Sequence, residues 1–89
     1  MSHILDSDIK VIFEAFKKID NLEDFKNFIC DLCTIKEIES MAQRINAATL
    51  LLKGETYDQI MEHTDISSAT LSRVSKCVHY GEGYKKILQ

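Results

Sequence analysis

The chain has 89 residues, which suits one small domain whose folding removes only about 60% of the unfolded surface from water. It is 45% hydrophobic and 28% charged, and it has no proline and three glycines, which favours helices over a turn-rich sheet. No apolar run approaches the roughly 20 residues that span a bilayer. The N-terminus lacks the basic start and apolar stretch of an export signal, and the cysteines number three. These features disfavour a membrane or exported protein and predict a cytoplasmic one.

The charge of the chain is divided unevenly along its length. The total is −3 at neutral pH, which is acidic for a protein that binds nucleic acid. Residues 67–89 carry four basic side chains, Arg73, Lys76, Lys85 and Lys86, and one acidic side chain, Glu82. Their net charge is +3, so the preceding residues carry −6. This segregation indicates one surface that faces phosphates, unless the cations cluster by chance in a short tail.

Three helices are predicted in the first part of the chain. Apolar residues recur at helical spacing over residues 7–19 and again over 22–32, with Asn21 as the N-cap of the second helix. A long helix follows at 35–53, and its apolar side chains surround much of its circumference. In so small a chain, some of the partners that cover it are expected to come from a second subunit. Gly54 is expected to be the left-handed residue past its end.

Two short helices joined by a tight turn are predicted in residues 56–79. Thr56 and Gln59 have the spacing of a capping box at the start of the first helix, and Ser67 or Ser68 caps the second. The side chains expected to face the core are Tyr57, Ile60 and Met61 on the first helix and Leu71, Val74 and Val78 on the second. This arrangement is the helix-turn-helix plan.

Together the elements predict an all-α fold of about six helices, organised as a single domain over residues 1–89. The predicted parts are N-terminal dimerisation helices in 1–33, a long core helix in 34–54, the helix-turn-helix in 56–79 and a C-terminal helix in 82–89.

The second helix of the predicted motif has the residues that DNA recognition needs. Such a helix enters a major groove about 12 Å wide and contacts base edges and phosphates. Its outward face is expected to carry small, polar and basic side chains, namely Ser68, Ala69, Ser72, Arg73, Ser75 and Lys76, with Thr70 adding a hydroxyl contact. The alternative is an ordinary helical hairpin with a solvated polar face, and spacing alone does not decide between the two.

Five short motifs in one order carry a family resemblance over about Phe25 to Leu88. They are LCT at 32–34, MAQR at 41–44, LLKGE at 51–55, ATLSRV at 69–74 and YGEGY at 80–84. In this order they resemble the Trp-repressor superfamily, and within it the YerC/YecD family of Trp-repressor-like proteins. The resemblance implies an intertwined homodimer that binds a palindromic duplex DNA operator, with half-sites about one helical turn apart. The function implied is a DNA-binding transcriptional regulator, in particular a repressor.

The resemblance also implies an effector pocket. Thr34, Arg44 and Arg73 align with the threonine and two arginines that hold the corepressor tryptophan in the Trp repressor. Cys77 stands where the repressor has a serine for the ligand's amino group, and Val74 stands where it has a glycine. A thiol is a weak acceptor, and a β-branched side chain fills the space an indole would need. These departures disfavour tryptophan and leave another small-molecule corepressor, or no cofactor.

Other chemistry is weakly supported. Cys30 and Cys33 have metal-ligand spacing, but they lie in a helical apolar pattern without a second pair, so buried structural thiols are favoured over a metal site. No ordering of acids, histidine and serine suggests catalysis, so an enzyme is not expected.

A second class of function remains open. Gln59 and Glu62 stand where the Trp repressor has basic residues, and acids near phosphates weaken DNA binding. With the acidic total, this supports a helical dimeric protein–protein interaction module that has lost DNA binding.

Overall fold

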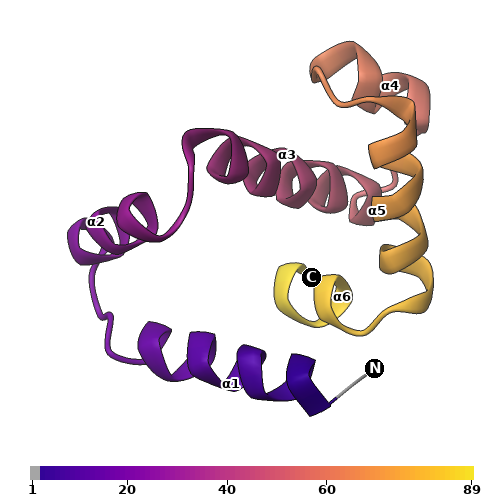
Figure 1. Ribbon diagram of the computed structural model, residues 1–89. Coiled ribbons are helices and arrows are strands. Elements are labelled where there is room, and N and C mark those ends of the chain that lie inside the picture. Colours follow the sequence, from indigo (N-terminus) through magenta and orange to yellow (C-terminus); the bar gives the residue numbers. More distant parts are fainter. Residues whose placement is uncertain (1–2) are drawn as a thin grey trace. The chain divides into compact units, whose positions relative to one another are not determined.

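The computed structural model describes residues 3–89, with side chains from Leu5 onward; Met1 and Ser2, at the start of the predicted segment 1–33, lie outside this range. Residues 3–89 form six α-helices and no strand (Figure 1). The helices are α1 (His3–Phe16), α2 (Leu22–Leu32), α3 (Ile35–Leu52), α4 (Tyr57–His63), α5 (Ser68–Tyr80) and α6 (Gly83–Leu88). The predicted all-α fold is therefore confirmed. The helices fall into two compact units, an N-terminal unit that ends at Thr34 and a C-terminal unit, Ile35–Gln89.

The N-terminal unit holds α1 and α2. α1 ends at Phe16, three residues before the predicted end, because the α-helical hydrogen bonds give way to the shorter bonds of a 3₁₀-type turn. The Lys18 and Ile19 N–H groups donate to carbonyls three residues earlier in the chain. α2 spans the predicted residues, and Asn21 is its N-cap as predicted, since its side-chain oxygen accepts the Asp24 N–H at 2.8 Å.

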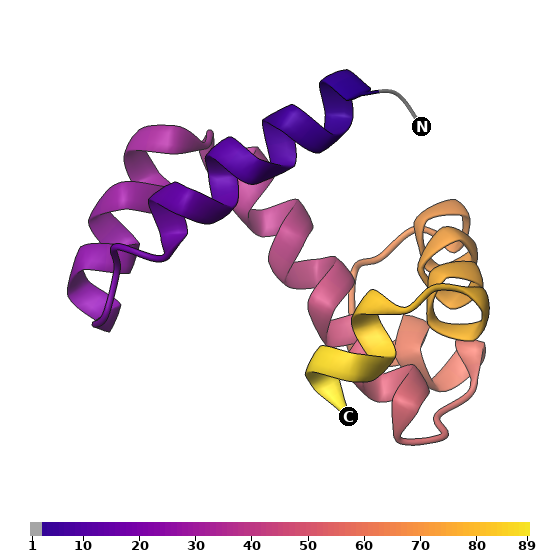
Figure 2. The ribbon, with the colours of Figure 1, turned by 90° about the horizontal axis from the view of Figure 1, so that it is seen from below.

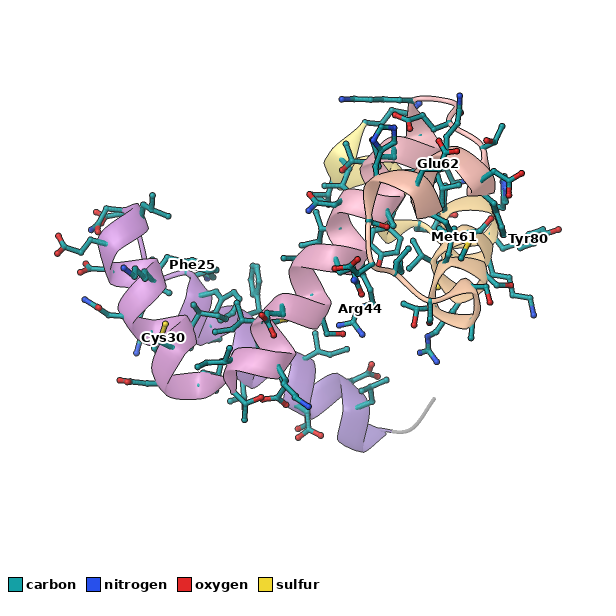
Figure 3. All side chains as sticks on the ribbon, turned by 90° about the horizontal axis from the view of Figure 1, so that it is seen from above. Phe25, Cys30, Arg44, Met61, Glu62 and Tyr80 are labelled. Carbon is teal, nitrogen blue, oxygen red and sulfur yellow. The ribbon has the colours of Figure 1, made fainter. Side chains whose placement is uncertain are left out.

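Aromatic rings join the two helices of the N-terminal unit. The Phe16 ring lies edge-on to Phe25 and Phe28, with centroids 5.8 and 5.9 Å apart. Figure 3 shows Phe25 and Cys30 on α2. No described side chain of α1 or α2 is buried, and Val11 and Phe13 are 70% and 59% exposed. Two helices alone therefore leave most of their apolar surface in water.

The C-terminal unit is built around α3. This helix packs against α4, α5 and α6, and Figure 2 shows its end lying among them. Ala47 and Ala48 are fully buried in α3, and such small side chains allow α5 to approach closely. The core that results consists of Ala47, Ala48, Ile60, Ile66, Leu71, Val74 and Val78.

A left-handed glycine ends α3 as predicted. Gly54 has φ +93°, a conformation that side chains rarely adopt. The Glu55 N–H then donates to the Leu50 carbonyl at 3.1 Å, the long bond of a Schellman motif. This turn ends α3 and leads into the start of α4.

Candidate nucleic-acid interface

The first helix of the motif, α4, begins at a complete capping box. Thr56 Oγ1 accepts the Gln59 N–H at 3.2 Å, and Gln59 Oε1 accepts the Thr56 N–H at 2.8 Å, as predicted. Ile60 is fully buried. The prediction was wrong for Tyr57 and Met61, which are 42% and 41% exposed. A two-turn helix contacts its neighbour along one line, so one stripe of its side chains is buried. Ile60 lies on that stripe.

The turn between α4 and α5 is held by Thr64 and Ile66. Thr64 Oγ1 donates to the Ile60 carbonyl at 2.9 Å and accepts the Ile66 N–H at 3.3 Å. Ile66 is 3% exposed and anchors the turn in the core. Sequence reasoning missed both roles. The available signal was a hydroxyl residue four positions after a buried helical residue, a spacing at which threonine bonds the helix carbonyl.

The second helix, α5, is capped by Ser67, the first of the two predicted candidates. Ser67 Oγ accepts the Thr70 N–H at 3.2 Å and donates to Thr70 Oγ1 at 2.9 Å. Leu71, Val74 and Val78 are buried as predicted. Ser75 was expected on the outward face, but it is 5% exposed. It lies one turn from both Leu71 and Val78 on the inner stripe, so the packing of α5 on α3 covers it.

The outward face of α5 carries most of the predicted DNA-binding side chains. Exposed along one stripe are Ser68, Ala69, Ser72, Arg73 and Lys76, and Thr70 is half-buried at its edge. The side chains of the first turn are short, so the helix backbone is unobstructed there. The two cations follow in the second and third turns. This arrangement offers small hydrogen-bonding groups at one end and positive charge behind them.

The charges around α5 differ in sign from one element to the next. On α4, Asp58 and Glu62 are exposed, whereas α6 presents Lys85 and Lys86. Lys85 Nζ donates to the His79 carbonyl at 3.2 Å, at the C-terminal end of α5, where a cation suits the helix dipole. Cations therefore continue from α5 into α6, while α4 contributes acids.

The candidate effector residues are distributed over both units. Thr34 ends the N-terminal unit. In the C-terminal unit, Arg44 is half-buried on α3, one turn before the buried alanines (Figure 3), and Arg73 and Cys77 are exposed on α5. Val74, beside Arg73 in sequence, is 1% exposed and belongs to the core.

An open apolar groove lies on the C-terminal unit, with a volume of about 520 Å³. It is formed by α3, α5 and α6, and its lining includes Ile45, Cys77, Tyr84, Ile87 and Leu88. Of the candidate effector residues in the described part of the chain, Cys77 lines it. Apolar walls suit an apolar occupant rather than a charged one.

The cysteines are free thiols. The prediction of buried thiols was wrong for Cys30, which is exposed, and for Cys33, which is half-buried, because no residue of α2 is buried; Cys77 is exposed as well. Within residues 3–89, no three His, Cys, Asp or Glu side chains are grouped as metal ligands. Over the same residues, no helix has the combined length and apolarity that crossing a membrane requires.

Comparison with known proteins identifies the family. The family described as Trp repressor protein matches residues 7–89, and the chain belongs to it. Members of this family are regulatory DNA-binding proteins rather than enzymes, in agreement with the expectation from the sequence. The uncharacterized protein YerC of Bacillus subtilis strain 168 is 44% identical over 70 residues, which are 79% of this chain and 67% of YerC. The resemblance stated from the sequence is thereby confirmed.

Two solved structures have the same fold. A candidate Trp repressor from Staphylococcus aureus superposes with a TM-score of 0.87 at 33% identity, covering 99% of this chain and 92% of that one. A TrpR-like protein from Eubacterium eligens gives a TM-score of 0.84 at 36% identity, covering 91% and 84%. The helix-turn-helix and the long α3 are therefore part of a Trp-repressor-like fold.

Proposed function

We propose that the protein is a sequence-specific DNA-binding transcriptional regulator, in particular a repressor, that inserts α5 into the major groove. The observation that carries this proposal is the division of α5 into two faces. Leu71, Val74 and Val78 are buried in the core, while the stripe with Arg73 and Lys76 is exposed. Membership of the Trp repressor family supports the same use of the helix.

The proposed contacts follow from position along α5. Ser68, Ala69 and Ser72 approach base edges, because small side chains let the backbone come close. Thr70 contacts the phosphate backbone, and the N-terminal end of the helix favours the same anion. Arg73 and Lys76 supply the charge that neutralises phosphates.

We propose that the regulator acts as a homodimer joined through the helices in residues 1–33. Support comes from α1, whose Ile9, Val11 and Phe13 are more than half exposed in the single chain. The C-terminal unit offers an apolar groove that includes Ile45 and Ile87, which are 47% and 79% exposed. Burying such side chains between subunits stabilises a small fold by about 1.5–3 kcal/mol for each large one. A two-fold dimer presents two copies of α5 to one face of a palindromic operator.

The proposed effector site comprises Thr34, Arg44, Arg73 and Cys77, with a ligand other than tryptophan. Val74 supports this choice, since the resemblance implies that its β-branched side chain stands where the Trp repressor has a glycine. A carboxylate remains a suitable partner for Arg44.

Selection of bound sequences from random duplex DNA tests the function. It is run at low salt with the wild-type chain and with Arg73→Ala, each with and without L-tryptophan. We expect a palindrome enriched by the wild type, with half-sites about one helical turn apart, and no dependence on tryptophan. Equal, unenriched pools from both proteins would overturn the proposal.

A second candidate is an interaction module that has lost DNA binding. The exposed acids of α4, Asp58 and Glu62, favour it, because they adjoin the helix that would lie in the groove. It predicts that no duplex is enriched while the dimer persists, so the same selection separates the two functions.

A further inference from the structure

Two exposed surfaces of opposite charge lie at opposite ends of the C-terminal unit. The first, the acidic face, consists of Tyr57, Asp58, Met61 and Glu62 on α4. Tyr57 and Met61 are one turn apart and form an apolar stripe, 42% and 41% exposed. Asp58 and Glu62 form a parallel acidic stripe beside it. Figure 3 shows Met61 and Glu62 on α4.

The second surface, the basic end, consists of Tyr80 and Lys85. Tyr80 is the last residue of α5 and is 86% exposed, projecting away from the unit in Figure 3. Its ring lies edge-on to His79, with centroids 6.3 Å apart. Lys85 Nζ is held 3.2 Å from the His79 carbonyl, so its charge lies beside the backbone that carries Tyr80. The ammonium group is thus held at the C-terminal end of α5, the helix that ends with the exposed Tyr80.

We propose that the acidic face of one copy docks on the basic end of a second copy. The Tyr80 ring packs against Met61, since a thioether sulfur interacts favourably with an aromatic edge. Lys85 pairs with Glu62 across the contact. A second copy is the occupant because the chain itself carries the complement: the exposed Lys85 of the basic end is opposite in sign to the exposed Asp58 and Glu62 of the acidic face. The contact does not require DNA and goes beyond the proposed function.

The geometry makes this contact head to tail. In Figure 1, α4 and α6 lie on opposite sides of α3 within the C-terminal unit. Each docked copy therefore leaves one acidic face and one basic end free, and further copies add in a row. The contact involves few side chains, far fewer than a stable interface, so its Kd is expected on the order of 1 mM. Such a contact forms where copies are concentrated, as on neighbouring sites along one duplex.

The proposal is tested by the amide chemical shifts of the full chain in the absence of DNA. The shifts are measured across a dilution series around the millimolar range. We expect concentration-dependent shifts confined to residues 57–62 and 79–85, weakened by added salt. Glu62→Lys and Lys85→Glu should each reduce the apparent association about tenfold or more, and the double variant should restore it. Matched controls with the same charge changes, Glu39→Lys and Lys86→Glu, should have smaller effects.

Several results would overturn it. They are shifts that do not depend on concentration at either surface, controls that act as strongly as the test variants, and a double variant that fails to associate. The first result would leave the acidic face to a different occupant. Because no DNA is present, these failures are distinct from a failure to bind an operator.

Discussion

Thr64 Oγ1 lies 2.9 Å from the carbonyl oxygen of Ile60, to which it donates a hydrogen bond, and the same hydroxyl accepts the Ile66 N–H. One side chain thereby links the last turn of α4 to the residue that anchors the turn in the core. The link holds the turn against the C-terminal end of α4.

Replacing Thr64 by valine removes the hydroxyl and keeps the shape. We expect Thr64→Val to lower the free energy of unfolding by about 1–2 kcal/mol, since the half-buried Ile66 N–H loses its partner. Thr49→Val is the control, because Thr49 Oγ1 bonds only the Ile45 carbonyl within α3. Urea denaturation of both variants measures the difference, and equal midpoints would contradict the assigned role.

The N-cap of α5 gives a second prediction. Ser67→Ala removes the acceptor of the Thr70 N–H and should cost about 1 kcal/mol of stability. Ser68→Ala, one residue later and exposed inside the first turn, should change stability by only a few tenths of a kcal/mol. Thermal unfolding of the two variants tests which serine caps the helix. A larger loss of stability for Ser68→Ala would contradict Ser67 as the N-cap.

Two glycines should respond to alanine in opposite directions. Gly54 has φ +93° and no atom within 4 Å of an added Cβ, so Gly54→Ala costs backbone strain alone, about 1 kcal/mol. Gly83 has equally open surroundings but starts α6 in a helical conformation. Gly83→Ala should therefore stabilise the chain by up to about 1 kcal/mol. Denaturation midpoints that move in the same direction would contradict the left-handed assignment.

Removing either exposed cation of α5 should weaken DNA binding without unfolding the protein. Arg73→Ala and Lys76→Ala are each expected to cost about 1–3 kcal/mol of binding free energy. Each lost phosphate contact should also make the plot of the logarithm of the binding constant against the logarithm of salt concentration less steep, by about one unit of slope. Lys26→Ala, on the exposed face of α2, is the charge-matched control. Fluorescence anisotropy over a salt series measures both quantities, with circular dichroism to verify the fold. Binding by the α5 variants that matches the control would refute the proposed interface.

Truncating an exposed aromatic of α1 should weaken the proposed dimer. Phe13 is 59% exposed in the single chain, yet Phe13→Ala should raise the dimer dissociation constant roughly 30-fold, the equivalent of about 2 kcal/mol. Tyr80→Ala, which removes a still more exposed aromatic from α5, should leave it unchanged at micromolar concentration. Sedimentation velocity distinguishes the two. A monomeric wild type, or equal effects of both variants, would refute dimerisation through α1.

The sequence predicted which side chains of α5 are buried and which are exposed, with the exception of Ser75. The division of α5 into an inner stripe and an outer stripe follows from helical periodicity, so Leu71, Arg73 and Lys76 lie where the sequence predicted. Ser75 did not, because a small polar side chain is compatible with either face. Periodicity cannot say how wide a stripe the neighbouring helix will cover.

The sequence by itself determined the local elements: the N-cap at Asn21, the capping box at Thr56 and the left-handed end at Gly54. Each depends on groups within a few residues of one another, so short-range spacing suffices. Only the tertiary structure decided that Ile66 is an anchor and that Tyr57 and Met61 face solvent. Burial depends on which distant helix packs against a stripe, and that partner lies beyond any local pattern.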